Sequence, residues 1–179
     1  MGPRTCIFDI SIFKGHADAV TSVCYNREGN KALTSSNDSK IILWDCQSAQ
    51  FIRKYEIHSN RVNRAVFSPK EDRILSVSYN GQIIETDMET RDIRLKIEEV
   101  DDRNSCMLKI DNNIVLVGTN DGMIKAWDIS NHRCERIFPG HEQSIKCIAR
   151  YGNRIYTAGE DKKLYVWSYT EGFIEKKCP

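Results

Sequence analysis

The sequence lacks a surplus of charge of either sign. Its 26 lysines and arginines are balanced by 25 aspartates and glutamates, so the formal net charge is +1. A groove that follows the phosphate backbone of a nucleic acid normally leaves a clear basic excess. We therefore expect no nucleic-acid partner.

Long hydrophobic runs are also missing. No stretch approaches the roughly 20 apolar residues that a membrane-spanning helix needs. The first residues, Met1 to Cys6, contain no apolar core of a secretory signal, and Cys6 stands where an N-myristoylation site has Ser or Thr. Cys178 is the penultimate residue, which leaves no prenylation box. We expect neither secretion nor a membrane anchor.

Patterns that bind metal or form disulfides are absent as well. The seven cysteines include no Cys-x-x-Cys pair, and the four histidines are scattered. Most of the cysteines lie in strand-like stretches, where a free cysteine behaves as a small hydrophobic residue. We expect no metal, no cofactor and a reducing compartment, which is the cytoplasm or alternatively the nucleus.

What the sequence does contain is an internal repeat. Counted from Trp44, the equivalent positions are Thr86, Trp127 and Trp167, at steps of 42, 41 and 40 residues. Six residues before these positions stand Asp38, Asn80, Asp121 and Asp161. A histidine lies 26 to 28 residues before three of the four positions: His16, His58 and His141. The third repeat has no histidine in that region.

Each repeat contains about four strand signals, which are β-branched or alternating runs separated by turns rich in Gly, Asn and Asp. They predict strands at 21–25, 31–36, 41–44, 50–55, 62–67, 73–78, 82–86, 93–97, 105–110, 114–119, 123–127, 134–138, 145–150, 154–158, 164–167 and 173–176. A repeat near 40 residues with four strands is typical of a propeller blade. We expect an all-β fold of four four-stranded antiparallel blades, at about 13–55, 56–98, 99–138 and 139–178.

The repeats resemble those of the WD40 family of β-propellers. Gly15-His16 with Trp44-Asp45, Gly140-His141 with Trp167-Ser168, and Trp127-Asp128 are similar to the Gly-His and Trp-Asp signatures of that family. The resemblance covers nearly the whole chain, about residues 13–177.

The resemblance also implies a structural network in each blade, from Trp through Ser or Thr and His to Asp, because a buried indole N–H must find an acceptor. Carried over, it consists of Trp44, Ser36, His16 and Asp38; His58, Ser78 and Asn80; Trp127, Thr119 and Asp121; and Trp167, Thr157, His141 and Asp161. Gly159 stands where the first blade has Ser36, so the fourth blade takes Thr157, two residues earlier. The uncharged Asn80 is expected to bind His58 more weakly than a carboxylate would.

Sets of His, Ser and Asp also suggest a catalytic triad. A triad needs an exposed nucleophile beside a base and an oxyanion site. These residues instead recur in successive blades and are expected to point into the structure. We therefore expect a protein that is not an enzyme.

The resemblance implies a ring of about seven blades, whereas this chain encodes four. Residues 1–12 are expected to form a leading outer strand of a blade that the chain does not encode. The four blades should then form an incomplete, open arc. Three explanations remain: a shortened product or isoform of a longer protein, which we favour, an arc that pairs with a second copy, or one completed by another chain.

Function in such folds lies in loops rather than in the scaffold. The candidates for contact with a partner are Asn37, Arg61, Asn63, Tyr79, Asn120, Ser144, Lys146 and Glu160. We favour Arg61, Tyr79 and Lys146, since Tyr and Arg lead interaction hot spots; ordinary solvated surface is the alternative. The acidic run Glu98 to Asp102 is either a solvated face or a site that attracts a basic peptide.

These observations predict a non-catalytic WD-repeat scaffold that binds proteins or peptides in a larger assembly. The alternative is a shortened product or isoform of a longer propeller, with a regulatory role or no independent function.

Overall fold

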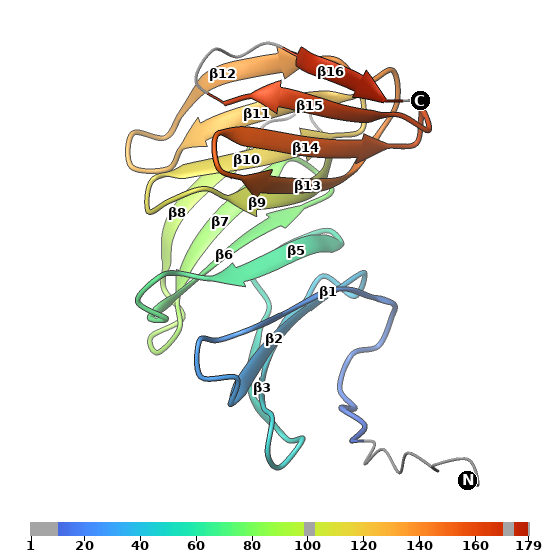
Figure 1. The fold of residues 1–179 in the computed structure, drawn as a ribbon. Coiled ribbons are helices and arrows are strands. Elements are labelled where there is room, and N and C mark those ends of the chain that lie inside the picture. Colours follow the sequence, from blue (N-terminus) through green and yellow to red (C-terminus); the bar gives the residue numbers. More distant parts are fainter. Residues whose placement is uncertain (1–10, 99–102, 170–173, 179) are drawn as a thin grey trace, which may run out of the picture.

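The computed structural model describes residues 11–98, 103–169 and 174–178, and these ranges form four antiparallel sheets of four strands each (Figure 1). No helix occurs in these ranges, and therefore none that could span a membrane. The predicted all-β class is confirmed. The expected leading strand at 1–12 falls almost entirely outside the described residues.

The strand bounds lie within two residues of those predicted. The first sheet contains β1 (Val20–Tyr25), β2 (Lys31–Ser36), β3 (Ile41–Asp45) and β4 (Phe51–Tyr55), and the second contains β5 (Val62–Phe67), β6 (Arg73–Ser78), β7 (Gln82–Asp87) and β8 (Ile93–Glu98). The third contains β9 (Asn104–Lys109), β10 (Ile114–Thr119), β11 (Met123–Asp128) and β12 (Arg133–Pro139), and the fourth contains β13 (Ile145–Tyr151), β14 (Arg154–Gly159), β15 (Leu164–Ser168) and β16 (Ile174–Cys178).

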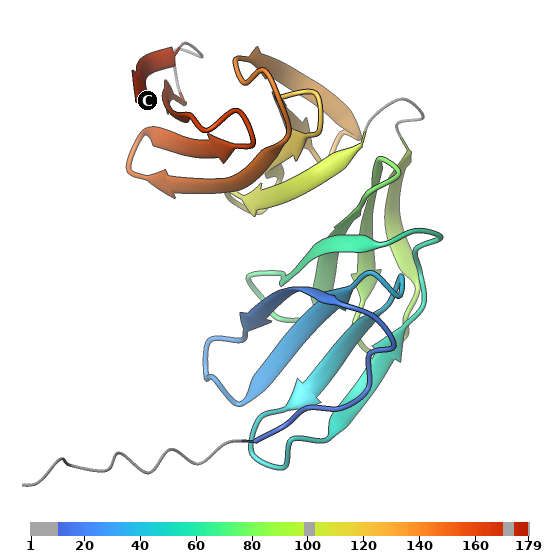
Figure 2. The ribbon, with the colours of Figure 1, turned by 90° about the vertical axis from the view of Figure 1, so that its right-hand side faces the viewer.

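Neighbouring strands of each sheet follow one another in the sequence, because short turns join them as successive hairpins. The first strands of the sheets lie together: β1 contacts β5, β5 contacts β9, and β9 contacts β13. No comparable contact joins the first sheet to the fourth among the described residues. Figures 1 and 2 accordingly show the first sheet, in blue, and the fourth, in red, at opposite ends of an arc. The expected open arc of four blades is confirmed.

The core consists of apolar layers between successive sheets. Ile74 and Leu75 are neighbours on β6, and both are fully buried. Because side chains alternate across a strand, Ile74 packs with Leu33 of the first sheet, and Leu75 packs with Val115 of the third. Strands buried on both faces need continuous apolar runs, which explains why several strands of this sequence do not alternate.

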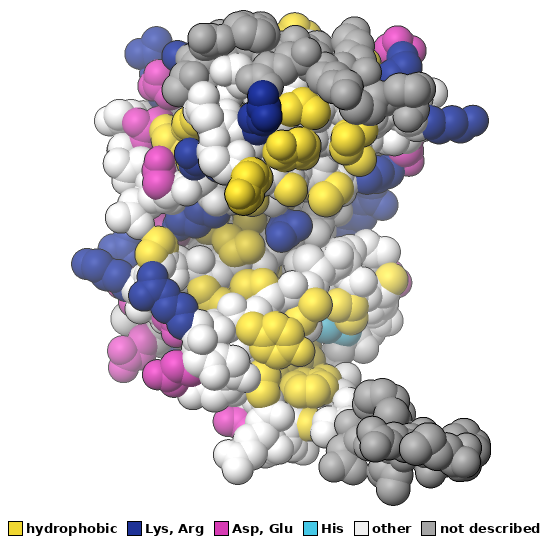
Figure 3. Space-filling model, viewed as in Figure 1, with side chains coloured by type: hydrophobic (Ala, Val, Ile, Leu, Met, Phe, Trp, Pro, Cys, Tyr) yellow, Lys and Arg dark blue, Asp and Glu magenta, His cyan; other side chains and the backbone are white. Residues whose placement is uncertain are grey.

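The two ends of the arc carry exposed apolar side chains. Val20, Val23 and Tyr25 of β1 are exposed, as are Tyr151 and Leu164 of the fourth sheet. Figure 3 shows hydrophobic side chains gathered over β1 and β2, and again over β13 and β14. These areas are the sheet faces that no further sheet covers among the described residues.

Candidate functional site

The network of the first sheet links four side chains. His16 Nδ1 lies 2.9 Å from Asp38 Oδ2, and His16 Nε2 lies 2.7 Å from Thr34 Oγ1. The indole N–H of Trp44 donates to the same Thr34 oxygen at 2.7 Å. The predicted Ser36 is therefore wrong as the hydroxyl of this network. Its own hydroxyl donates to the carbonyl oxygen of Asp18 at 3.1 Å.

The register of β2 against β3 explains the correction. Ala32 pairs with Trp44 and Thr34 pairs with Ile42, so Thr34 is the diagonal neighbour of Trp44 on one sheet face. Ser36 shares the face of Thr34 by alternation but lies two residues farther from the indole. Both are hydroxyl residues on the same side of one strand, and they differ in that the indole of Trp44 and the imidazole of His16 reach Thr34.

The Gly15-His16 step packs tightly against Trp44. A Cβ added at Gly15 would lie 2.8 Å from the indole ring, and the Phe13 ring meets that indole edge-on at 5.5 Å between centroids. A cavity of about 490 Å³ borders this segment. Residues 13–16 thus cover Trp44 on the open face of the first sheet.

The fourth sheet brings together all four residues predicted for it. His141 Nδ1 lies 2.9 Å from Asp161 Oδ1, and Nε2 lies 2.8 Å from Thr157 Oγ1. Trp167 Nε1 donates to Thr157 Oγ1 at 2.8 Å. The side chains of His141 and Asp161 are only 0% and 2% exposed. This network is a buried clamp between the loop before β13 and the inner strands.

The second sheet departs from the predicted set. His58 Nε2 lies 2.8 Å from Ser76 Oγ, not Ser78, and Ser76 has the same place in the register as Thr34 in the first sheet. His58 Nδ1 lies 3.2 Å from the amide oxygen of Gln82, so the predicted bond to Asn80 is also wrong. Ser78 donates to Asn80 Oδ1 at 2.5 Å instead.

Two consequences follow from the missing carboxylate and indole in the second sheet. Burial lowers the pKa of His58 to about 4, although its hydrogen bond to Gln82 opposes that shift. Thr86, at the position of Trp44, has a buried hydroxyl for which the described residues provide no hydrogen-bond partner.

The third sheet contains Thr119, Asp121 and Trp127 but does not join them into one network. Thr119 donates to Asp121. The position equivalent to Thr34 is Val117, which has no hydroxyl, and Trp127 packs among apolar side chains such as Leu75. The absence of a histidine, noted in the sequence, thus coincides with the absence of the bridging hydroxyl.

The carboxylates of the complete networks are held ionised. Burial raises the pKa of Asp38, but hydrogen bonds from the Ala17 N–H, from His16 and from the Lys40 N–H outweigh it and leave the pKa below its usual value. The same balance, with His141 as the leading hydrogen bond, lowers the pKa of Asp161. Each carboxylate fixes its histidine and the adjacent turn.

The candidates for partner contact occupy a second repeated position. The backbone N–H of the residue before each turn Asp or Asn donates to a carbonyl at the start of the same sheet: Asn37 to Ala19 at 2.9 Å, Tyr79 to Arg61 at 3.0 Å, Asn120 to Arg103 at 2.9 Å, and Glu160 to Ser144 at 2.9 Å. Arg103 is therefore the equivalent of Arg61. The sequence interpretation missed it, because the third repeat has no histidine from which to count.

Two of the residues predicted to contact a partner form hydrogen bonds within the fold instead. Ser144 is 5% exposed, and its hydroxyl donates to Asn120 Oδ1 at 3.1 Å. The Asn63 amide donates to the carbonyl of Asn104 in the next sheet. The favoured Lys146 is exposed but forms a 2.8 Å ion pair with Glu160.

Arg61, Tyr79 and Arg103 form one group, here called the arginine–tyrosine cluster. Arg61 Cζ lies 3.8 Å from the centroid of the Tyr79 ring, and Arg103 Cζ lies 5.6 Å from it. Arg103 Nη1 also donates to the Tyr79 hydroxyl at 3.3 Å. Both arginines are exposed and Tyr79 is half-buried.

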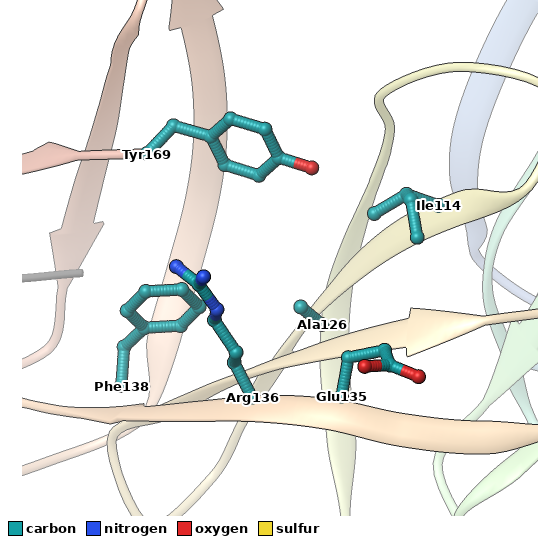
Figure 4. Close-up of a pocket in the computed structure, with 6 residues that line it drawn as sticks. All are labelled: Ile114, Ala126, Glu135, Arg136, Phe138 and Tyr169. Atoms are coloured by element: carbon teal, nitrogen blue, oxygen red, sulfur yellow. The ribbon is translucent and has the colours of Figure 1, made fainter. Parts of the chain in front are cut away.

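A cavity of about 330 Å³ between the third and fourth sheets is lined by Ile114, Ala126, Glu135, Arg136, Phe138 and Tyr169 (Figure 4). Arg136 extends from β12 beside Phe138 toward Tyr169, whereas Glu135 points away from them. Three of the six lining residues are apolar, and none is a histidine, cysteine or serine. No group of three metal-binding side chains occurs in the part of the chain that the structure describes.

Four radially packed sheets, each beginning at a common centre, define this molecule as a β-propeller assembly. The hydrogen-bond networks from Trp through Thr and His to Asp in the first and fourth sheets are those of WD-repeat propellers. The family model described as "WD domain, G-beta repeat" matches residues 8–45, 49–84 and 132–168, together more than half of the chain. The chain belongs to the WD40 family.

Several curated proteins are similar to it. The pre-mRNA-splicing factor cwf17 of Schizosaccharomyces pombe is 29% identical over 75% of this chain and 40% of that protein. The target of rapamycin complex subunit wat1 of the same yeast is 24% identical over 93% of this chain and 58% of that protein. Pre-mRNA-processing factor 19 of Bos taurus is 28% identical over 78% and 28%, respectively. The chain thus spans between about a quarter and three fifths of these relatives.

Proposed function

We propose that the chain is a non-catalytic scaffold that binds protein or peptide partners through the loops at the start of its first strands. The observation that supports this proposal most directly is the arginine–tyrosine cluster. In it, two exposed arginines and a half-buried tyrosine, the residue types that dominate interaction hot spots, come together from two sheets. The similarity to a splicing factor and to a subunit of the target of rapamycin complex supports a role in assemblies.

The burial of the polar networks supports a non-catalytic role. A nucleophile must be reached by its substrate, yet Thr157 is 1% exposed and its oxygen already accepts the Trp167 indole N–H. Burial also raises the pKa of the Cys106 thiol to about 11, which leaves little thiolate near neutral pH. The polar groups of these sheets therefore serve as clamps.

Partner capture by cross-linking tests this proposal. The variant Arg61→Glu/Tyr79→Ala should lose partners that the wild type retains. Arg27→Glu is the matched control, because Arg27 is an exposed arginine in the turn after β1, at the opposite ends of the strands. Identical partner sets for all three proteins would remove the cluster as a contact site.

A second proposal is that the chain acts as part of a longer or completed propeller. It is supported by the exposed apolar side chains on β1 and on the fourth sheet. Sedimentation at several concentrations tests whether a second copy completes the propeller. Association with rising concentration supports a second copy, whereas a monomer throughout contradicts a second copy and leaves a longer chain or a different partner chain.

For the compartment, we propose the cytoplasm or the nucleus. Cys24, Cys46, Cys106 and Cys147 are free thiols, which fits a reducing environment. The balanced net charge supports a protein partner rather than a nucleic acid.

A further inference from the structure

We propose that the arginine–tyrosine cluster binds an oxyanion carried by a peptide, either a side-chain carboxylate or a phosphorylated side chain. This proposal rests on the scaffold function above and specifies the chemistry of the partner.

The geometry of the cluster prepares its arginines for an anion. The ends of β5, β6 and β9 that carry it lie next to one another (Figure 1). Arg61 lies over the face of Tyr79, 3.8 Å from the ring centroid. Stacking on a ring fixes a guanidinium and leaves the N–H groups at its edge available for a bidentate oxyanion.

The arginines of the cluster have no acid partner among the described residues, unlike several lysines and arginines elsewhere on the molecule. Ion pairs hold six of these: Lys40 with Glu56, Arg73 with Glu85, Arg94 with Asp87, Lys96 with Glu98, Lys146 with Glu160, and Lys163 with Glu142. Arg61 and Arg103 form no ion pair with any carboxylate in the described ranges. A carboxylate or phosphate from a partner would therefore displace no acid of the described residues from these arginines.

The second sheet also lacks the carboxylate that the other sheets have in the turn between their second and third strands. Asn80 replaces the acid found at Asp38, Asp121 and Asp161. Its amide donates to Ser59 Oγ at 3.2 Å, so a neutral side chain occupies the turn that follows Tyr79. A turn carboxylate at this position would have repelled an anionic ligand.

The acids nearest in sequence define the competing interpretation. Glu98 is bound to Lys96 at 2.7 Å and to Gln82 at 2.7 Å. Glu99, Asp101 and Asp102 immediately precede Arg103 and lie outside the described residues. If these acids determined the electrostatic potential at the cluster, the cluster would select a basic peptide. The charge of the preferred peptide therefore decides between the two interpretations.

Fluorescence anisotropy with labelled peptides provides the test. A Glu-rich peptide, a phosphoserine peptide, a neutral Gln/Ser peptide and a Lys-rich peptide of equal length are titrated against the full chain. The two anionic peptides, or the phosphorylated one alone, should bind at least about tenfold more tightly than the neutral one, as expected for charge-assisted hydrogen bonds. Binding by both peptides identifies a carboxylate as sufficient, and binding by the phosphopeptide alone identifies phosphate as the ligand.

Variants assign that binding to the cluster. Arg61→Gln/Arg103→Gln should remove the preference for anions, Arg61→Lys should weaken it, and Arg27→Gln should leave it unchanged, with thermal unfolding used to show that each variant is folded. Asp101→Asn/Asp102→Asn should strengthen binding of the anionic peptide.

The proposal is overturned if the Lys-rich peptide binds best, if no anionic peptide exceeds the neutral one, or if the double arginine variant binds anionic peptides as the wild type does. The two proposals can fail separately. If one of these results is obtained while Arg61→Glu/Tyr79→Ala still loses its partners in the capture experiment, the scaffold function is supported and only the anionic ligand is contradicted.

Discussion

The Thr21 hydroxyl donates a hydrogen bond to the carbonyl oxygen of Val62, 2.5 Å away, and so joins the first strand of one sheet to the first strand of the next. Asn63 makes the same bond to the Asn104 carbonyl, and the Ser105 hydroxyl makes it to the Ile145 carbonyl at 2.5 Å. The three donors occupy equivalent positions in successive repeats. A ladder of side-chain bonds therefore connects the sheets near their common centre.

Removing one of these bonds should loosen the molecule. Asn63→Ala leaves the Asn104 carbonyl without this donor, and we expect a loss of about 1–2 kcal/mol in the free energy of unfolding. Urea denaturation followed by fluorescence measures it. Asn112→Ala, at an exposed asparagine in a turn, is the control and should change stability little. Equal stability of both variants would show that the bond contributes nothing net.

The bridging hydroxyl of the fourth sheet should be essential to its stability. Thr157→Val leaves the Trp167 N–H and one His141 nitrogen unpaired, so we expect a loss of about 2–3 kcal/mol. Thr157→Ser keeps the hydroxyl, as Ser76 does in the second sheet, and should recover most of that loss. The comparison is made by denaturant unfolding at neutral pH, and a Val variant as stable as the Ser variant would contradict the clamp.

In the second sheet, removing a hydroxyl should increase stability. Thr86 has a buried hydroxyl without a partner in the described part of the chain. Thr86→Val has nearly the same shape and removes that polar group, so it should stabilise the protein by about 1 kcal/mol. Calorimetry detects this as a higher Tm. An unchanged or lower Tm would mean that the hydroxyl has a partner in solution.

The repeat was predictable because its signals are local. The spacing of Trp44, Trp127 and Trp167 and the Gly, Asn and Asp turns between apolar runs predicted every strand, since hairpins are determined by neighbouring residues. The network hydroxyls were not predictable with the same accuracy. Thr34 and Ser36 lie on one face of one strand, and their roles differ because Trp44 and His16 reach Thr34, a distance that the sequence does not specify.

The other corrections arise from contacts between distant segments. Gln82 replaces the predicted Asn80 at His58, because a longer amide on β7 reaches the imidazole while Asn80 binds Ser78 and Ser59. Arg103 of the third sheet donates a hydrogen bond to Tyr79 of the second, and the pattern within one repeat cannot predict a contact between two repeats. Such pairings depend on how sheets pack rather than on the pattern within each repeat.

Stability should fall as the pH drops from about 6.5 to about 4, the range between the ordinary pKa of His58 and its value in the folded chain. In that range the unfolded chain binds a proton at His58 and the folded chain does not. Protonation therefore favours unfolding, and the effect reaches about 3 kcal/mol near the lower limit and stays constant below it. Urea denaturation across this pH range measures the slope.

Two variants isolate this histidine from the carboxylates that titrate at lower pH. His58→Gln removes the titrating group, so the slope between pH 6.5 and about 4 should become shallower than in the wild type.

Asn80→Asp restores the carboxylate that Asp161 provides to His141 at 2.9 Å in the fourth sheet. That charge should raise the pKa of His58 and shift the loss of stability to a narrower range, because an adjacent carboxylate favours the imidazolium. NMR titration of the His58 ring checks the direction, and an unchanged pKa would mean that Gln82 keeps the carboxylate from reaching the imidazole.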